Sequence, residues 1–158
     1  MDSTSTAILD TLFNGLDLQG LLLLINRIVV GVFFAISGFH KLFLKKRHEA
    51  LVATLKDDKL PMVAFNQWFV PLVEFFAGIA LVIGFLAPLA AIGILVLMTV
   101  AIVTDGTKRV HEFEPVDKAD ALDDVLYLSE TTYWFMALFV IIGGPGWYSL
   151  HNLLLPAF

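Results

Sequence analysis

The stretch from Leu21 to Lys46 limits what this chain can fold into more than any other part of it. It holds more than twenty predominantly apolar residues and ends in a basic cluster. A helix of ~20 apolar residues, rising ~1.5 Å per residue, crosses a hydrocarbon core of ~30 Å. Two charged residues, Arg27 and Lys41, interrupt the apolar run. The stretch therefore predicts a membrane-spanning helix that carries ionisable groups into the bilayer.

The two charges share a helix face with small residues. Arg27, Gly31, Phe34, Gly38 and Lys41 are spaced 4, 3, 4 and 3 apart, which places them along one stripe. In lipid, glycine lets a neighbouring helix approach closely, and ionisable side chains turn toward protein partners. We expect this stripe to face the protein interior, with the two glycines as helix-packing positions.

Composition supports a membrane protein and excludes several kinds of site. The 158 residues are 58% hydrophobic and 16% charged, whereas soluble domains average ~45–50% and ~25%. The absence of Cys excludes disulfides, thiolate metal sites and cysteine nucleophiles. No metal-ligand spacing and no basic patch interleaved with aromatic residues occurs, so neither a metal site nor nucleic-acid binding is predicted. Because the segment before residue 21 has no basic residue, we interpret the first apolar run as a retained span rather than a signal peptide.

The order of apolar and polar segments predicts an all-α, integral membrane four-helix bundle in a single domain, residues 1–158. Four spans are expected, at about 21–44, 69–86, 88–104 and 127–142. Pro88 predicts a tight hairpin between the second and third spans. A basic connection at 45–67, with a short surface helix, and a polar, solvated loop at 105–124 complete the arrangement.

The basic residues predict the orientation in the membrane. Nine of the ten flank or fill the first and third connections. These nine are Lys41, Lys45, Lys46, Arg47, Lys56, Lys59, Lys108, Arg109 and Lys118. The positive-inside rule then places both connections in the cytoplasm and both termini outside. We expect the protein in the cytoplasmic (inner) membrane of a bacterium or archaeon.

The second span carries a face like that of the first. Pro71, Glu74, Gly78 and Leu81 are spaced 3, 4 and 3 apart. Gly78 is a third helix-packing candidate, and Glu74 is expected to pair with Lys41 or with the neighbouring histidine.

Depth along the spans suggests a polar cluster near the cytoplasmic side. Lys41 ends the first span, Glu74 lies roughly 8 Å into the second at ~1.5 Å per residue, and Glu130 opens the fourth. With His40 and Tyr127, these residues could meet. The cluster is either a structural ion-pair network or a site for a polar head group or proton relay. The candidates for ligand binding or proton transfer are Arg27, His40, Lys41, Glu74, Tyr127 and Glu130.

Arg27 stands apart from that cluster. It lies ~21 Å along the helix axis from Lys41, toward the outer leaflet. A guanidinium keeps its charge, so its donors need acceptors. We expect these to be carbonyls at the helix end at 143–146, Asp17, Tyr148, or a bound ligand or lipid phosphate.

Together these motifs resemble the DoxX family of small four-helix membrane proteins. The family usually has Asp after the Ser-Leu pair that closes its pattern, where this chain has His151. The residues that carry the resemblance are Arg27-x3-Gly31-x6-Gly38-x2-Lys41, Pro71-x2-Glu74-x3-Gly78 with Gly84, Glu130, and Gly144-Pro145-Gly146-x2-Ser149-Leu150.

The resemblance implies a function in membrane redox chemistry, because some members are similar to the small subunit of thiosulfate:quinone oxidoreductase. The chain would be a membrane subunit of a quinone-linked oxidoreductase or redox assembly. It would bind a quinone or lipid-like ligand between the first, second and fourth spans, with no intrinsic cofactor. A soluble or membrane redox protein, or a second copy of the chain, would be its partner in the bilayer. The alternative is a non-catalytic anchor or scaffold for a soluble partner at the cytoplasmic face.

Overall fold

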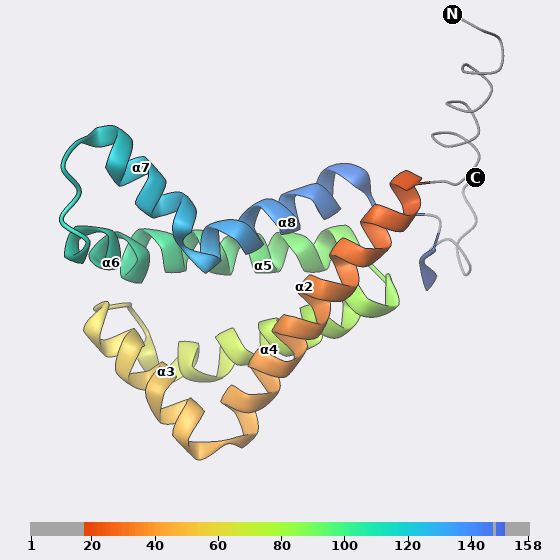
Figure 1. Cartoon of the computed structure of the whole chain (residues 1–158). Coiled ribbons are helices and arrows are strands. Elements are labelled where there is room, and N and C mark those ends of the chain that lie inside the picture. The colour runs from red at the N-terminus through yellow and green to blue at the C-terminus, as the bar shows by residue number, and fades with distance from the viewer. Residues whose placement is uncertain (1–17, 147, 151–158) are drawn as a thin grey trace, which may run out of the picture.

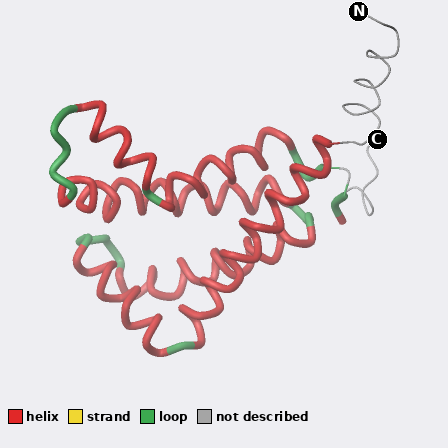
Figure 2. The backbone as a smooth tube through the Cα atoms, viewed as in Figure 1, coloured by secondary structure: helices red, strands yellow, loops and turns green. Residues whose placement is uncertain are grey.

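The computed structural model describes residues 18–146 and 148–150, and every regular element in this part of the chain is a helix (Figure 1). Short loops join these helices (Figure 2). The elements are α2 (Leu18–Phe43), α3 (Lys45–Asp57), α4 (Val63–Ile83), α5 (Ala87–Ala101), the π-helical η1 (Ile102–Gly106), α6 (Thr107–Glu112), α7 (Lys118–Tyr127) and α8 (Ser129–Gly143).

Three of these helical segments are long and apolar enough to cross a membrane. They are residues 19–43, residues 63–83, and the continuous run of α5, η1 and α6. The bent pair α7 and α8 passes the same test when counted as one span, which brings the number to four. The prediction of an all-α integral membrane protein is therefore confirmed.

Helices α2 and α4 pack closely and antiparallel, and glycines make this possible. A Cβ on Gly31 would lie 2.7 Å from the carbonyl oxygen of Gly78, and one on Gly38 would lie 2.7 Å from that of Pro71. Such distances leave no room for a side chain, so the two backbones are nearly in contact. Close approach of this kind is how membrane helices gain packing energy where lipid supplies no hydrophobic driving force.

The chain turns sharply between α4 and α5. Gly84 has φ +72°, the left-handed conformation that glycine adopts without a steric penalty, and it follows the last residue of α4. Leu86 is also left-handed at φ +49°, and Pro88 lies in the first turn of α5, where its missing N–H costs nothing. Three residues therefore connect the second and third spans.

The polar segment at 105–124 is not a loop throughout, which corrects the expectation. The third span continues through η1 into α6 and ends at Glu112, and α7 begins at Lys118. Polar residues there still suit a helix in water: Arg109 Nε lies 3.0 Å from the Asp105 carboxylate one turn away. The helix stops only just before Pro115, since proline disfavours helical conformation in its predecessor.

Helix α8 covers most of the segment expected as the fourth span, and α7 before it occupies mainly the segment expected as a solvated loop. Helices α7 and α8 meet at 70°, and Leu128 between them is extended (φ −66°, ψ 133°). The Leu128 side chain is buried, and its Cδ1 lies 2.9 Å from where a Gly106 Cβ would be. The packing of Leu128 against Gly106 positions the bend, although neither Pro nor Gly occurs there in the sequence.

The four long helices pack in a ring of neighbours. Helix α2 lies along α4, α4 along α5, α5 along α8, and α8 returns to α2. The largest fully buried apolar side chains in the interior are Val30, Phe34, Leu81, Ile94 and Val140. Helices α3, α6 and α7 gather at one end of the molecule, opposite the α4–α5 turn and the end of α8 (Figure 1).

Candidate functional site

The buried carboxylate of Glu74 is held by α2. Lys41 Nζ lies 2.6 Å from Glu74 Oε1 and 2.8 Å from Oε2, and the Ser37 hydroxyl donates to Oε2 at 3.2 Å. Glu74 is 3% exposed, whereas the Lys41 side chain is 27% exposed. The contact between Gly38 and α4 brings the helices close enough for these side chains to meet. Glu74 therefore faces the interior, as expected, and its partner is Lys41.

A pocket of about 320 Å³ lies beside this ion pair. Lys41 and Ser37 both line it and both contact Glu74, so they connect the pocket to the buried carboxylate. One part of its wall is apolar and the rest is cationic or polar. The lining residues are Phe33, Ile36, Ser37, His40, Lys41 and Arg47.

The pocket belongs mainly to α2, with Arg47 contributed by α3. The lining includes no residue of α4 or α8. Glu74 of α4 contacts the lining residues Lys41 and Ser37, and Tyr133 of α8 stacks on the lining residue Phe33 at 4.2 Å between ring centroids. The pocket therefore lies on α2 and α3, beside contacts with the second and fourth spans, and not between the three spans.

Glu130 does not join this cluster. Its Oε1 accepts a 2.6 Å hydrogen bond from Arg109 Nη2, and the Ser129 hydroxyl donates to its other oxygen. Arg109 also pairs with Asp105, so η1, α6 and α8 share a separate ionic cluster. The suggestion of one polar cluster is thus corrected. The position of Glu130 in the fourth span predicts only its depth. Its partner depends on the third span continuing through η1 into α6, because α6 carries Arg109.

Tyr127 lies outside both ionic clusters. It is the last residue of α7 and is 86% exposed. The bend at Leu128 removes Tyr127 from the face that it would share with Glu130 on a continuous helix.

Arg27 lies at the other end of α2 and is 1% exposed. Its Nη2 donates a 2.6 Å hydrogen bond to the Tyr148 carbonyl oxygen, one of the expected acceptors. A Cβ on Gly84 would overlap Arg27 Nη1, so the guanidinium occupies the space that this glycine leaves. Within the described part of the chain, Nε and Nη1 have no hydrogen-bond acceptor. Asp17 and His151, also considered above, lie outside the described residues.

Other polar contacts were not anticipated. Asn26 Nδ2 donates to the Met136 carbonyl oxygen at 2.9 Å and ties α2 to α8. Lys108 Nζ lies 2.6 Å from Asp58 Oδ1 and joins α6 to the turn after α3. The sequence does hold a signal for the contact of Asn26 with α8, because Asn26 is a polar residue next to Arg27 inside an apolar run. For Lys108 the sequence predicted only a cytoplasmic position, as one of the nine basic residues, and no ion-pair partner.

No three His, Asp or Glu side chains within residues 18–146 and 148–150 are grouped so that they could hold a metal ion. At or beside the pocket, Ser37, His40, Lys41 and Glu74 present hydrogen-bonding and ionisable groups.

Comparison with known proteins gives one match. The family model described as DoxX matches residues 22–105, from α2 into η1, and so covers both helices of the Lys41–Glu74 pair. Neither the curated proteins nor the solved structures contain a match.

Proposed function

This chain belongs to the DoxX family, and on that premise we propose that it is the membrane subunit of a redox assembly and binds a quinone beside the Lys41–Glu74 pair. The observation that carries the proposal is the position of Lys41. It contacts both oxygens of a buried carboxylate and also lines a pocket with His40. The chain has no Cys, so the electrons would come from a redox partner protein.

The pocket's chemistry suits a quinone head group. The ring is apolar and can lie against Phe33 and Ile36, while its carbonyl oxygens accept hydrogen bonds from His40 and Lys41. Phe33 and Ile36 are both exposed on the membrane-spanning helix. A ligand dissolved in the bilayer could therefore enter without crossing water.

Reduction of a quinone takes two electrons and two protons, one proton for each carbonyl oxygen. Lys41 and His40 would donate hydrogen bonds as negative charge develops on those oxygens. The redox partner would supply the two electrons, and the two protons would come from water and pass to the quinone oxygens through Lys41 and His40. Glu74 would balance the charge of Lys41 in the low-dielectric interior. Arg27 is fourteen positions away on α2, ~21 Å along the axis, and we assign it no contact with this ligand.

Quinone binding can be tested on purified protein in lipid nanodiscs, by equilibrium binding of a short-chain quinone analogue. His40→Leu is expected to weaken binding about tenfold, which corresponds to the ~1–1.5 kcal/mol of one hydrogen bond. The matched control is Lys45→Met, because Lys45 is exposed and does not line the pocket.

Two results would contradict the proposal. One is an unchanged affinity in His40→Leu. The other is no measurable binding by the parent protein, which would leave the anchor or scaffold hypothesis for this family member.

We further propose an inner-membrane location with both termini outside and with α3, α6 and α7 in the cytoplasm. The support is that these helices lie at one end of the molecule (Figure 1) and that the nine basic residues lie in them or in the adjoining helix end and turn. Since the chain has no Cys, single substitutions can be labelled without background.

The labelling experiment uses a membrane-impermeant maleimide on intact cells. Lys46→Cys is expected to react only after permeabilisation, whereas Phe85→Cys in the α4–α5 turn should react from outside. Labelling of Lys46→Cys in intact cells would contradict the proposed orientation and indicate the opposite one.

A further inference from the structure

The pocket beside the Lys41–Glu74 pair lies across the end of the first span. Helix α2 ends at Phe43, and the lining extends beyond it to Arg47 in α3. Within α2, the lining residues Phe33 and Lys41 are eight positions apart, ~12 Å along the helix axis. The pocket therefore has an apolar part at the depth of lipid acyl chains and a basic part at the depth of lipid head groups.

The charge of the pocket favours an anion. Its lining includes no acidic residue. The charge of Lys41 is already balanced by Glu74, whereas the Arg47 side chain forms no ion pair with the residues that the structure describes. A guanidinium keeps its charge and binds phosphate oxygens through two parallel hydrogen bonds. A neutral quinone would leave the charge of Arg47 without a counter-ion, and a phosphate would supply one.

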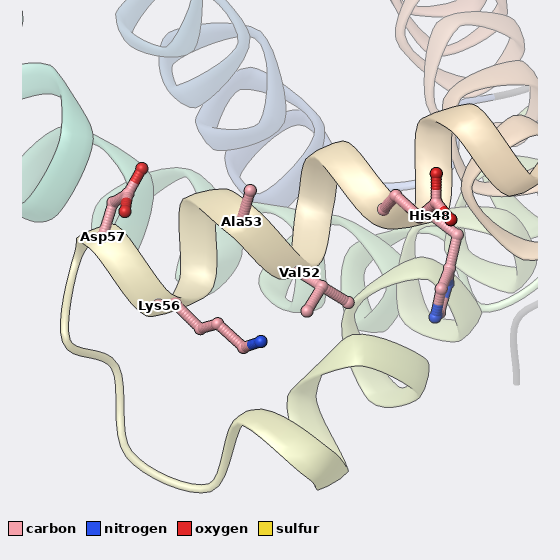
Figure 3. Close-up of a pocket in the computed structure, with 6 residues that line it drawn as sticks. His48, Val52, Ala53, Lys56 and Asp57 are labelled. Atoms are coloured by element: carbon pink, nitrogen blue, oxygen red, sulfur yellow. The ribbon is translucent and has the colours of Figure 1, made fainter.

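A hollow on α3 shows that this charge is not common to the whole basic segment. It has a volume of about 430 Å³, and Val52 and Ala53 are its apolar residues (Figure 3). Its charged lining residues are Lys56, Glu49 and Asp57. One basic residue against two acidic residues gives no preference for an anion, so we do not expect phosphate to bind there.

We propose that the pocket across the end of the first span binds an anionic phospholipid. The phosphate accepts hydrogen bonds from Arg47 and His40, and one acyl chain lies against Phe33 and Ile36. Both apolar side chains are exposed on the membrane-spanning helix, so the acyl chain reaches them from within the bilayer. Basic pockets at the cytoplasmic ends of membrane helices bind acidic lipid head groups in this way.

This inference goes beyond quinone binding and does not depend on it. It gives a function to Arg47, a lining residue to which the quinone proposal assigns none. The lipid and the quinone would use the same apolar residues, so they would compete for the pocket.

Lipid binding can be measured by native mass spectrometry on protein purified in a non-ionic detergent, with no quinone present. Phosphatidylglycerol is compared with phosphatidylcholine of the same acyl chains, because both contain a phosphodiester but only phosphatidylglycerol has a net negative charge. The parent protein is expected to bind phosphatidylglycerol about tenfold more tightly. Glycerol 3-phosphate, which carries the phosphate without acyl chains, should bind far more weakly than phosphatidylglycerol.

Single substitutions separate a site at Arg47 from general attraction to the basic helix. Arg47→Gln is expected to weaken phosphatidylglycerol binding about tenfold, because the charge-assisted contact with the phosphate is lost. The matched controls are Lys46→Gln and Lys56→Gln. Each removes one positive charge from an exposed position of α3 that does not line the pocket, and each should change the affinity less than about twofold.

Three results would overturn the proposal. The first is equal affinity of the parent protein for the two lipids. The second is an equal loss in Arg47→Gln and in either control, which would mean that the basic residues of α3 attract anionic lipid without a site. The third is binding of glycerol 3-phosphate as tight as that of phosphatidylglycerol, which would indicate a site for a soluble phosphate ester. None of these results bears on the quinone proposal, which is tested with a different ligand and with His40→Leu.

Discussion

Lys41→Met is expected to lower the free energy of unfolding by about 3–5 kcal/mol, the usual cost of leaving one member of a buried ion pair without its partner. The carboxylate left behind belongs to Glu74, which is 3% exposed and, within the described part of the chain, would keep only the Ser37 hydroxyl as a donor. The measurement is SDS-driven unfolding in mixed micelles, followed by circular dichroism.

The controls for this prediction follow from the unequal burial of the two partners. Glu74→Ala should cost less, because the Lys41 side chain is 27% exposed and can extend its ammonium toward water. The double variant Lys41→Met with Glu74→Gln should recover most of the loss, since it leaves no buried charge. If the single Lys41→Met variant and the double variant unfold alike, the two groups are not coupled.

Gly78→Ala is expected to cost about 1–3 kcal/mol, the range for adding volume to a tightly packed interior, even though alanine is the better helix former. The added Cβ would overlap the backbone nitrogen of Ala35 and lie 2.7 Å from the Gly31 carbonyl oxygen. Both are backbone atoms that cannot rotate away, so α2 and α4 would have to separate. That separation should also lengthen the contact between Lys41 and Glu74.

Gly93→Ala is the matched control for the Gly78 substitution. Among the described residues, a Cβ at this position would meet only the Cγ1 of Val73, at 3.4 Å, so the same chemical change should leave stability unchanged or slightly raised. Equal effects at the two glycines would mean that the close approach of α2 and α4 does not limit stability.

Several features of the interior follow from residue spacing on single helices. Arg27 and Phe34 are each 1% exposed, and Gly31 and Gly38 contact α4. The face formed by Pro71, Glu74, Gly78 and Leu81 on α4 is buried in the same way. Spacing suffices here because the helical period fixes which residues share a face. In lipid, charged side chains find partners only on the face toward other helices, and small residues on that face let the backbones approach closely.

The sequence by itself therefore determined an all-α membrane protein and the inward faces of its first two spans. The sequence also allowed the pair of Lys41 with Glu74, but the partner of Glu130 and the exposure of Tyr127 were decided only by the tertiary structure. Glu130 pairs with Arg109 because the third span continues through η1 into α6, and Tyr127 is exposed because Leu128 packs against Gly106 and bends the chain. The physical reason is that spacing along one helix specifies a direction and a depth. A partner for that side chain depends on which helices are neighbours and on where each one ends.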